Sequence, residues 1–335
     1  MDMRNLRMMM KAAVLNGYGP VENFQLREVE KPVPKKGEIL LKVHAASINS
    51  WDWEILKGTP FANRIMFGLT RPRPGLIVGC DVAGVVESLG PGVDMFQPGA
   101  EVYGDISHCN WGGFAEYVCA SQTAFVKKPE GMTFEQAAAI PQAGLLALQG
   151  LRYNGGLQPG QKALFIGAGG GAGMFAVQIA KRLGVEFTGV DRGETLDKLK
   201  ELGADHVVDF KREDVAESGL RYDMILDVAV CHPVSYYERM LNPGGAFVVI
   251  GGSMGKIMQT ALWGPVLSRI KGKKLGLLIH KPDREDLAHM SGLFQAGQMK
   301  PVIDSVFPLE RVVDAFRHYE QKRFVGKIVM TMDAG

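Results

Sequence analysis

Short apolar runs separated by glycine and proline dominate the chain as far as Val126. They predict strands, because apolar runs too short for helices and bounded by turn residues suit a pleated sheet. The predicted strands are 11–16, 24–29, 38–45, 78–89, 101–103 and 114–118. Successive strands without intervening helices indicate an antiparallel, barrel-like domain.

After Pro129 the pattern changes to helices that alternate with short apolar strands. Helical spacing of apolar positions predicts helices at 133–149 (broken near Pro141), 174–183, 195–202, 233–241, 283–296 and 311–321. Strands are predicted at 162–166, 186–190, 206–210, 224–228, 246–250, 275–279, 301–306 and 327–331. Such alternation gives parallel pairing through right-handed crossovers, so we expect a doubly wound α/β sheet of the Rossmann type.

Two further segments, 53–75 and 253–272, are predicted to be loops that shape a substrate pocket. Their apolar residues suggest an apolar cleft, although residues of this kind also pack as core or at a dimer interface. The residues concerned are Phe61, Ile65, Met66, Phe67, Met254, Met258 and Trp263.

The stretch from 162 to 191 reads as a strand, a glycine turn, a helix and a second strand. The turn consists of seven residues with little or no side chain, namely Gly167, Ala168, Gly169, Gly170, Gly171, Ala172 and Gly173. A helix N-terminus presents unpaired N–H groups and a partial positive charge, which stabilise a pyrophosphate if the backbone comes close enough. The sequence therefore predicts a dinucleotide site here, against the alternative of a tight turn that binds nothing.

Residues at the strand ends extend this predicted coenzyme site. Ligands of doubly wound sheets lie beyond the carboxyl ends of the strands, which adds Asp191, Val228 and Gly251. Asp191 favours NAD, because a carboxylate accepts hydrogen bonds from the ribose hydroxyls and repels a 2′-phosphate. The neighbouring Arg192 would pair with that phosphate, so the choice between NAD and NADP stays open.

Composition narrows the class of protein. A chain of 335 residues predicts two domains, and its formal net charge of +2 comes without a long basic run. We therefore expect neither nucleic acid nor a membrane as partner, since no apolar stretch approaches the roughly 20 residues of a membrane span. The first ten residues, MDMRNLRMMM, lack the features of a secretory signal and are predicted to be a disordered extension of a cytoplasmic protein. The four cysteines contain no C-x-x-C pair, which excludes a four-cysteine zinc lobe.

Several motifs resemble the medium-chain dehydrogenase/reductase superfamily over nearly the whole chain from Met10. The string GCDVAGVVESLGPGVDMFQPGAEVYG at 79–104 and WGGFAEYV at 111–118 carry the resemblance to the superfamily. AAAIPQAGLLALQGL at 137–151, the glycine loop and LGADHVVDF at 202–210 resemble its zinc-independent quinone oxidoreductase branch. The resemblance implies a GroES-like catalytic domain (1–128, completed by 281–335), a Rossmann NAD(P)-binding domain (129–280) and a homodimer.

The resemblance also bears on metal chemistry. Where zinc-containing relatives would place Cys, His and Cys, this chain has Asn49, Cys80 and Gln142. A catalytic zinc site needs about three protein ligands, so we expect no metal. Gln142 is assigned instead to the predicted coenzyme-binding residues.

Without a Lewis acid the enzyme is poorly equipped to ionise a simple alcohol, whereas hydride addition to a quinone or an enone needs only hydrogen-bond donors and a proton. We therefore expect an NAD(P)H-dependent reductase of quinones or activated double bonds acting on a small-molecule substrate. Asn49 is the predicted donor near the nicotinamide, and Asp52 is a second catalytic candidate that could instead cap a helix. The alternatives are an alcohol dehydrogenase with a rebuilt metal site and a non-catalytic NAD(P)H-binding redox sensor.

Overall fold

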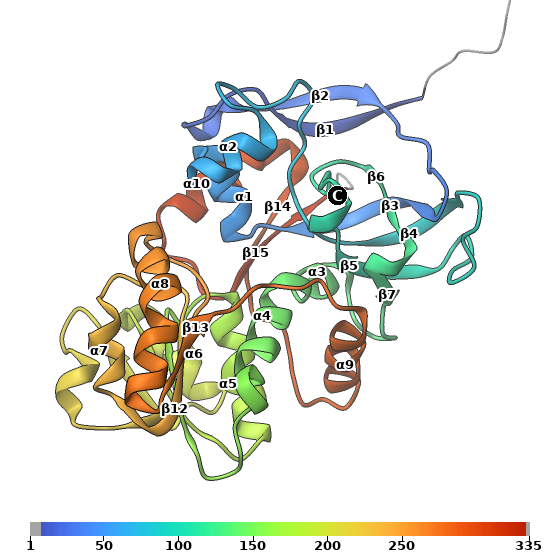
Figure 1. Ribbon diagram of the computed structural model, residues 1–335. Coiled ribbons are helices and arrows are strands. Elements are labelled where there is room, and N and C mark those ends of the chain that lie inside the picture. Colours follow the sequence, from blue (N-terminus) through green and yellow to red (C-terminus); the bar gives the residue numbers. More distant parts are fainter. Residues whose placement is uncertain (1–7, 333–335) are drawn as a thin grey trace, which may run out of the picture. The chain divides into compact units, whose positions relative to one another are not determined.

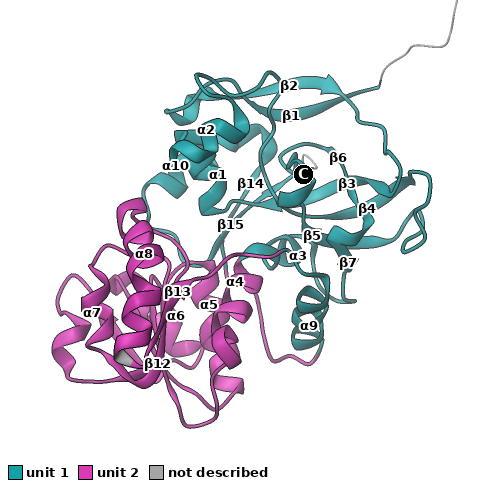
Figure 2. Ribbon diagram, in the orientation of Figure 1, with its two compact units in different colours: residues 1–142, 282–295, 303–335 teal, residues 143–281, 296–302 magenta. Residues whose placement is uncertain are grey.

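A computed structural model describes residues 8–332 and divides the chain into two compact units (Figure 2). Unit 1 contains residues up to Gln142 together with 282–295 and the chain from Ile303 onward. Unit 2 contains 143–281 and 296–302. These limits differ from the expected ones at 129–142, because helix α3 (Phe134–Ala138) packs on strands of unit 1. They differ again at 296–302, which joins unit 2.

Unit 2 is built on a six-stranded parallel sheet (Figure 1). Its strands are β8 (Lys162–Ile166), β9 (Glu186–Asp191), β10 (His206–Asp209), β11 (Tyr222–Asp227), β12 (Leu241–Val249) and β13 (Lys274–Leu277). Their order, β10-β9-β8-β11-β12-β13, with parallel pairing throughout, confirms the predicted doubly wound sheet. The connecting helices are α5 (Gly171–Arg182), α6 (Gly193–Glu201), α7 (Val234–Glu238) and α8 (Met254–Lys271).

Aromatic and branched side chains fill the core of unit 2. Phe165, Phe187 and Phe247 are fully buried on the sheet, and Tyr237 stacks on Phe247 with ring centroids 4.0 Å apart. The strands are apolar on both faces because helices cover both, as expected for a parallel sheet. The core therefore holds the carboxyl ends of β8, β9 and β11 in a fixed register, with Ile166 beside Val190 and Asp227.

The prediction of a loop at 253–272 is wrong, since α8 occupies Met254–Lys271. Ile257 and Leu267 pack on the core of unit 2, while other apolar residues of this helix point outward. A helix that is apolar on both faces shows no alternation of polar and apolar positions. The hydrophobic pattern therefore did not identify it.

Unit 1 carries a mostly antiparallel sheet, and the predicted GroES-like architecture is confirmed (Figure 1). Its order is β14-β15-β3-β4-β5-β7, and β6 pairs with β3. These strands are β3 (Glu38–Ser47), β4 (Asp81–Leu89), β5 (Glu101–Asp105), β6 (Tyr117–Ser121), β7 (Phe125–Lys127), β14 (Ile303–Pro308) and β15 (Lys327–Thr331). The pair β14 and β15 is parallel, which the expectation of a purely antiparallel domain did not include.

Helices complete unit 1. They are α1 (Ser50–Lys57), α2 (Phe61–Phe67), α3, α9 (Arg284–Gln295) and α10 (Val312–Glu320), and α4 (Pro141–Leu151) begins at its end. The predicted loop 53–75 thus contains part of α1 and all of α2. Phe67 belongs to the hydrophobic core, whereas Phe61, Ile65 and Met66 are exposed.

The N-terminal part of the chain differs from the expected extension. Residues 1–7 lie outside the described residues, but Met9 already belongs to β1 (Met9–Leu15), which pairs with β2 (Phe24–Glu30). Met10 is buried because it packs with Val29. Within residues 8–332 the structure contains no helix with the length and apolarity that crossing a bilayer requires.

Candidate functional site

The glycine loop lies between β8 and α5, at the carboxyl edge of the unit 2 sheet. Gly167 has φ +81°, and a Cβ there would lie 2.4 Å from Val228 Cγ2. A Cβ on Gly173 would lie 2.2 Å from the carbonyl oxygen of Ala168. Gly170 differs, because a Cβ there would meet nothing nearer than 3.8 Å. Two of these glycines therefore allow the loop to fold, while Gly170 leaves open space at the N-terminus of α5.

Asp191 closes this loop from the end of β9. Its Oδ2 accepts a hydrogen bond of 2.7 Å from the Gly169 N–H, and its Oδ1 accepts one of 2.8 Å from the Arg192 N–H. The Arg192 guanidinium lies 3.6 Å from the carboxylate of Glu194. Both carboxylate oxygens of Asp191 thus accept hydrogen bonds from backbone N–H groups. Asp191 therefore positions the loop, whether or not it also contacts a ribose.

A cavity of about 540 Å³ lies beside the loop, within unit 2. It is formed by the ends of β8 and β9 and by the loops that follow β10 and β11, where ligands of doubly wound sheets bind. The sequence analysis did not identify most of the residues that line this cavity. They follow the carboxyl ends of the predicted strands, where ligands of doubly wound sheets bind, so the same reasoning would have found them. The lining residues are Ile166, Gly167, Val190, Phe210, Lys211, Arg212, Glu213, Asp214, Val215, Ala229, Cys231, His232 and Tyr236.

The other predicted strand-end residues lie at the same sheet edge. Val228 directly follows β11 and packs against Gly167. Gly251 follows β12, and its carbonyl accepts a hydrogen bond of 3.0 Å from the Val230 N–H. Binding of a dinucleotide at this edge remains a prediction. The strand-end residues on which it depends lie together with the glycine loop in unit 2.

Unit 1 contains a buried cluster of polar side chains around Asp81, the first residue of β4. The Asn49 amide donates to Asp81 Oδ2 at 2.9 Å, and its Oδ1 accepts a hydrogen bond from Lys327 Nζ. Lys327 Nζ also donates to the Ile48 carbonyl at 3.1 Å and lies 3.5 Å from Asp81 Oδ2. Lys327 opens β15 and is 4 % exposed, so a buried ammonium sits within the cluster. The sequence analysis missed Lys327, whose only signal is a lysine at the start of an apolar strand.

Asp52 caps α1, which is one of the two roles that the sequence left open for it. It is fully buried, its Oδ2 accepts the Asn49 N–H at 2.8 Å and its Oδ1 accepts the Gly79 N–H at 2.9 Å. It thereby caps α1 and ties that helix to the segment before β4. Backbone groups thus contact both oxygens of Asp52, and a catalytic role for this residue remains a prediction.

Gln142 belongs to the polar cluster of unit 1, and its assignment to the coenzyme site remains a prediction. Its backbone N–H donates to Asp81 Oδ1 at 3.0 Å, and its side-chain amide lies 3.6 Å from Cys80 Sγ. It is buried in unit 1, whereas the glycine loop lies in unit 2. Gln142 is the second residue of α4, and its side-chain amide points toward Cys80.

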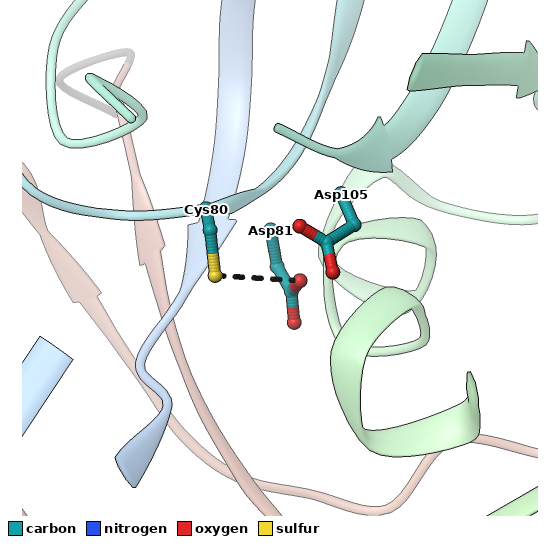
Figure 3. A group of neighbouring side chains, drawn as sticks. All are labelled: Cys80, Asp81 and Asp105. Carbon is teal, nitrogen blue, oxygen red and sulfur yellow. Dashed lines mark hydrogen bonds between the residues drawn. The ribbon is translucent and has the colours of Figure 1, made fainter. Parts of the chain in front are cut away.

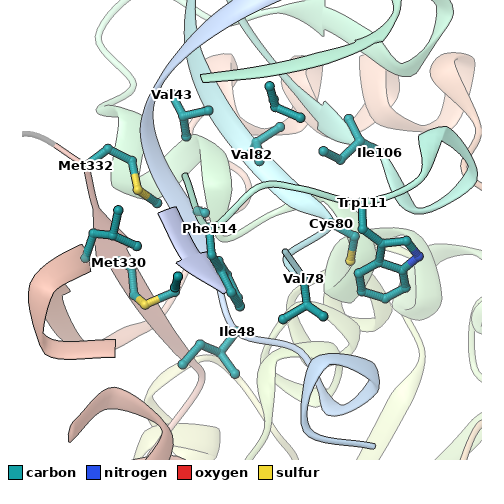
Figure 4. Packing of buried hydrophobic residues seen from close by; sticks show 14 of the residues in the cluster. Val43, Ile48, Val78, Cys80, Val82, Ile106, Trp111, Phe114, Met330 and Met332 are labelled. Atoms are coloured by element: carbon teal, nitrogen blue, oxygen red, sulfur yellow. The ribbon is translucent and has the colours of Figure 1, made fainter. Parts of the chain in front are cut away.

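Three potential metal ligands meet in this cluster, namely Cys80, Asp81 and Asp105 (Figure 3). Their ligand atoms lie within 4.8 Å of one another. They do not suit zinc, because the Lys327 ammonium beside Asp81 would repel a divalent cation. Cys80 also lies among apolar side chains such as Val78 and Trp111, and burial raises the pKa of its thiol well above the ordinary value (Figure 4). Zinc binds the thiolate, so this thiol is a poor ligand.

Buried carboxyl groups should make the stability of the protein depend on pH. Burial raises the pKa of Asp52 to about 7 and that of Asp227 to about 6. The folded state then holds protons that the unfolded chain releases above about pH 4, so the free energy of unfolding falls as pH rises toward about 7. We expect urea denaturation to give a larger free energy of unfolding at about pH 5 than at about pH 8. Asp227→Asn should reduce this difference, and equal stability at both pH values would contradict the assignment.

Comparison with known proteins adds independent information. An "Alcohol dehydrogenase GroES-like domain" model matches residues 35–130, and a "Zinc-binding dehydrogenase" model matches residues 202–330. The chain is 35 % identical to a chloroplast envelope quinone oxidoreductase homolog of Arabidopsis thaliana, over 96 % of this chain and 98 % of that protein. It is 30 % identical to an alcohol dehydrogenase of Geobacillus stearothermophilus, over 97 % of this chain and 100 % of that one. The solved structure of the quinone oxidoreductase from Coxiella burnetii matches 97 % of this chain and 100 % of its own, with 27 % identity and a TM-score of 0.86.

Proposed function

The chain belongs to the medium-chain dehydrogenase/reductase superfamily, in its quinone-oxidoreductase-like branch, and on that premise we propose that it reduces quinones and conjugated carbonyl compounds with NAD(P)H. The single observation that carries the proposal is the buried Lys327 ammonium, hydrogen-bonded to Asn49 beside Asp81. It occupies the cluster where a metal-dependent relative would need anionic ligands. The chemistry must therefore proceed with hydrogen-bond donors, which suits an electron-poor carbonyl compound.

The residues of unit 2 suit a dinucleotide. The open space at Gly170 gives a pyrophosphate access to the N–H groups that begin α5, and Asp191 holds the loop in that shape. A reduced nicotinamide bound to the protein would supply the hydride. The volume of the cavity beside the loop is typical of small-molecule sites, and its His232 and Tyr236 rings stack 4.0 Å apart.

The residues of unit 1 suit the stabilisation of negative charge. Asn49 holds its amide in place through Asp81 on one side and Lys327 on the other. The Lys327 ammonium offsets the negative charge of the Asp81 carboxylate, and burial keeps the Cys80 thiol protonated and uncharged. A carbonyl oxygen that gains negative charge near this cluster would be stabilised without a metal ion. We assign Asn49 to the contact with substrate and Lys327 to the positioning of Asn49.

The direct test is oxidation of NADH and NADPH by the purified protein with a panel of quinones, enones and aldehydes, each with and without a chelator. We expect turnover with quinones and enones that the chelator leaves unchanged. Stoichiometric zinc and loss of activity with chelator would support the alcohol dehydrogenase alternative instead. Coenzyme binding without any turnover would support the redox sensor.

The preference between NADH and NADPH should depend on the charge of Asp191. Asp191→Asn removes the carboxylate charge and keeps one oxygen for the Gly169 N–H, while the Arg192 N–H loses its acceptor, so thermal unfolding should be measured beside binding. We expect the ratio of the two dissociation constants to shift toward NADPH by about tenfold, because repulsion of the 2′-phosphate is lost. Titration of both coenzymes by protein fluorescence measures this ratio. An unchanged ratio would leave Arg192, Lys211 and Arg212 as the groups that set the preference.

We also propose that the protein is a homodimer in the cytoplasm. β13 is the last strand of the unit 2 sheet, and Ile279, just beyond it, is exposed. An unpaired strand edge with an apolar neighbour supports pairing with the same edge of a second copy. Light scattering should then give twice the mass of one chain. The free cysteines of the described chain support a reducing compartment.

A further inference from the structure

The segment between β5 and β6 contains three consecutive residues with positive φ. Asn110 has φ +71°, Trp111 has φ +66° and Gly112 has φ +110°. Glycine adopts such angles freely, whereas in a bulky residue they bring the side chain too close to its own backbone. Backbone strain of this kind persists only where surrounding contacts fix it, and it gathers at active sites and ligand-binding segments. The conformation of Trp111 therefore requires an explanation beyond the path of the chain.

In this conformation the Trp111 indole is buried in unit 1 and packs perpendicular to two other rings. Its centroid lies 5.8 Å from that of Phe67, with the planes at 87°, and 4.9 Å from that of Trp51, with the planes at 89°. Figure 4 shows the indole beside Cys80, whose Sγ accepts the Asn49 amide N–H at 3.5 Å. Trp111 thus joins Trp51 to the polar cluster that contains Asn49.

A second contact fixes the Trp51 indole. Trp51 lies in the first turn of α1, and its Nε1–H donates to Asn63 Oδ1 at 3.3 Å. Asn63 is buried in α2, and its amide N–H donates in turn to the Thr59 carbonyl at 2.9 Å. Asn63 therefore holds the polar edge of the Trp51 ring, and Trp111 holds the ring by direct contact. A side chain fixed in this way loses little conformational freedom when a ligand binds to it.

Trp51 differs from Trp53, which lies on the same helix. The Trp53 ring is covered by Tyr319, with centroids 5.6 Å apart, and by the Lys57 ammonium, 4.3 Å from the ring centroid. Trp51 is partly exposed, and within residues 8–332 no ring stacks parallel to it. Part of the Trp51 indole is thus open to a flat group.

The electronic character of the indole indicates which flat group it would accept. The face of an aromatic ring carries a negative potential, so it attracts a ring that is poor in electrons. A quinone is such a ring, and a fused-ring quinone also offers a large flat face. An open-chain enone has no ring face to stack. The two substrate types of the proposed reductase should therefore differ in their contact with Trp51.

We propose that Trp51 contacts the substrate and selects fused-ring quinones over open-chain enones, and that Trp111 positions Trp51 for this contact. The proposal rests on the proposed function, because the same substrate would direct its carbonyl oxygen to Asn49. The strained backbone of Trp111 then serves to hold the two indoles together beside the polar cluster.

The kinetic test compares kcat/KM for naphthoquinone and for ethyl vinyl ketone in the full chain and its variants. We expect Trp51→Leu to lower the quinone value by about tenfold, mostly through KM, because stacking stabilises the bound substrate and the transition state alike. The enone value should stay within about twofold of the wild type, since no stacking is lost. Trp51→Phe should restore most of the quinone value. Equal losses for both substrates, or no loss for the quinone, would overturn the proposal.

Trp53→Leu is the matched control, because it removes the same ring from the same helix. It should lower thermal stability and leave the ratio of the two kcat/KM values unchanged. Trp111→Leu should lower the quinone value as Trp51→Leu does. The double variant should lose no more than either single variant, since both changes remove one contact. Fully additive losses would contradict positioning of Trp51 by Trp111.

Binding measured without turnover separates this proposal from the proposed function. Naphthoquinone titrated into the protein with oxidised coenzyme present should quench tryptophan emission, and Trp51→Phe should remove more of this quenching than Trp53→Phe. That result in a protein without turnover would refute the reductase and leave Trp51 as the contact residue. Equal quenching in the two variants would refute the role of Trp51, and turnover beside it would leave the reductase intact.

Discussion

Gly170→Val is expected to give a folded protein that no longer binds NADH or NADPH. Gly170 has φ −81° and ψ 175°, which any residue adopts, and its Cβ position is open. A valine there fits the fold but fills the space in which a pyrophosphate would approach the first N–H groups of α5. We expect coenzyme affinity to fall by at least about a hundredfold with little change in thermal stability, because the side chain collides with the phosphate. Fluorescence titration and thermal unfolding measure the two quantities.

Two other glycines serve as controls for this prediction. Gly292 of α9 also has open space around its Cβ position, so Gly292→Val should leave both binding and stability intact. Gly173→Ala should behave in the opposite way, because its Cβ would lie 2.2 Å from the Ala168 carbonyl oxygen. We expect that variant to lose about 3 kcal/mol of unfolding free energy through steric strain. Unchanged coenzyme binding by Gly170→Val would refute the assignment of the loop.

Lys327→Met is expected to destabilise the protein by about 3–5 kcal/mol near pH 8 and to abolish turnover. The substitution leaves the buried Asp81 carboxylate without its cation and leaves Asn49 Oδ1 without its donor. Burial already raises the pKa of Asp81, and loss of the ammonium raises it further. The destabilisation should therefore shrink as pH falls, because protonation of Asp81 in the folded state removes the uncompensated charge.

The double variant Lys327→Met/Asp81→Asn is the control for this effect. It removes both charges, and the freed Asn49 amide oxygen is able to accept a hydrogen bond from the new amide. We expect it to recover most of the lost stability while remaining inactive, since a buried pair tolerates joint replacement better than loss of one partner. Urea denaturation at several pH values, together with coenzyme oxidation, provides the measurements. If Lys327→Met alone is as stable as the wild type near pH 8, Lys327 does not compensate the negative charge of Asp81.

Membership of one superfamily leaves room for different chemistry at the same position of the fold. One relative of this chain is an alcohol dehydrogenase and another is a quinone oxidoreductase homolog, at similar levels of identity. The residues around Asp81 separate the two possibilities better than identity does. Here an ammonium is held by an amide and forms an ion pair with a carboxylate, whereas a metal site would need thiolate or imidazole ligands in its place.

Local chemistry determined the parts of this protein that the sequence predicted. The alternation of helices and apolar strands after Pro129 specified the parallel sheet. Strands that are apolar on both faces need helices on both sides, and strand–helix–strand units provide them through right-handed crossovers. The glycine loop was recognisable because a close approach of the backbone to a phosphate requires consecutive residues with little or no side chain. The strand-end rule likewise placed Asp191, Val228 and Gly251 on one edge.

Tertiary structure alone decided the features that depend on distant partners. Lys327 meets Asn49 across 278 positions of chain, so its role has no local signal. Asp52 and Gln142 likewise meet partners that are distant in sequence, since Asp52 accepts the Gly79 N–H and the Gln142 backbone N–H donates to Asp81. Helix α8 escaped the pattern because a helix that is apolar on both faces has no amphipathic period. Periodicity reports which residues avoid water along one element, whereas the identity of their partners follows only from how the whole chain packs.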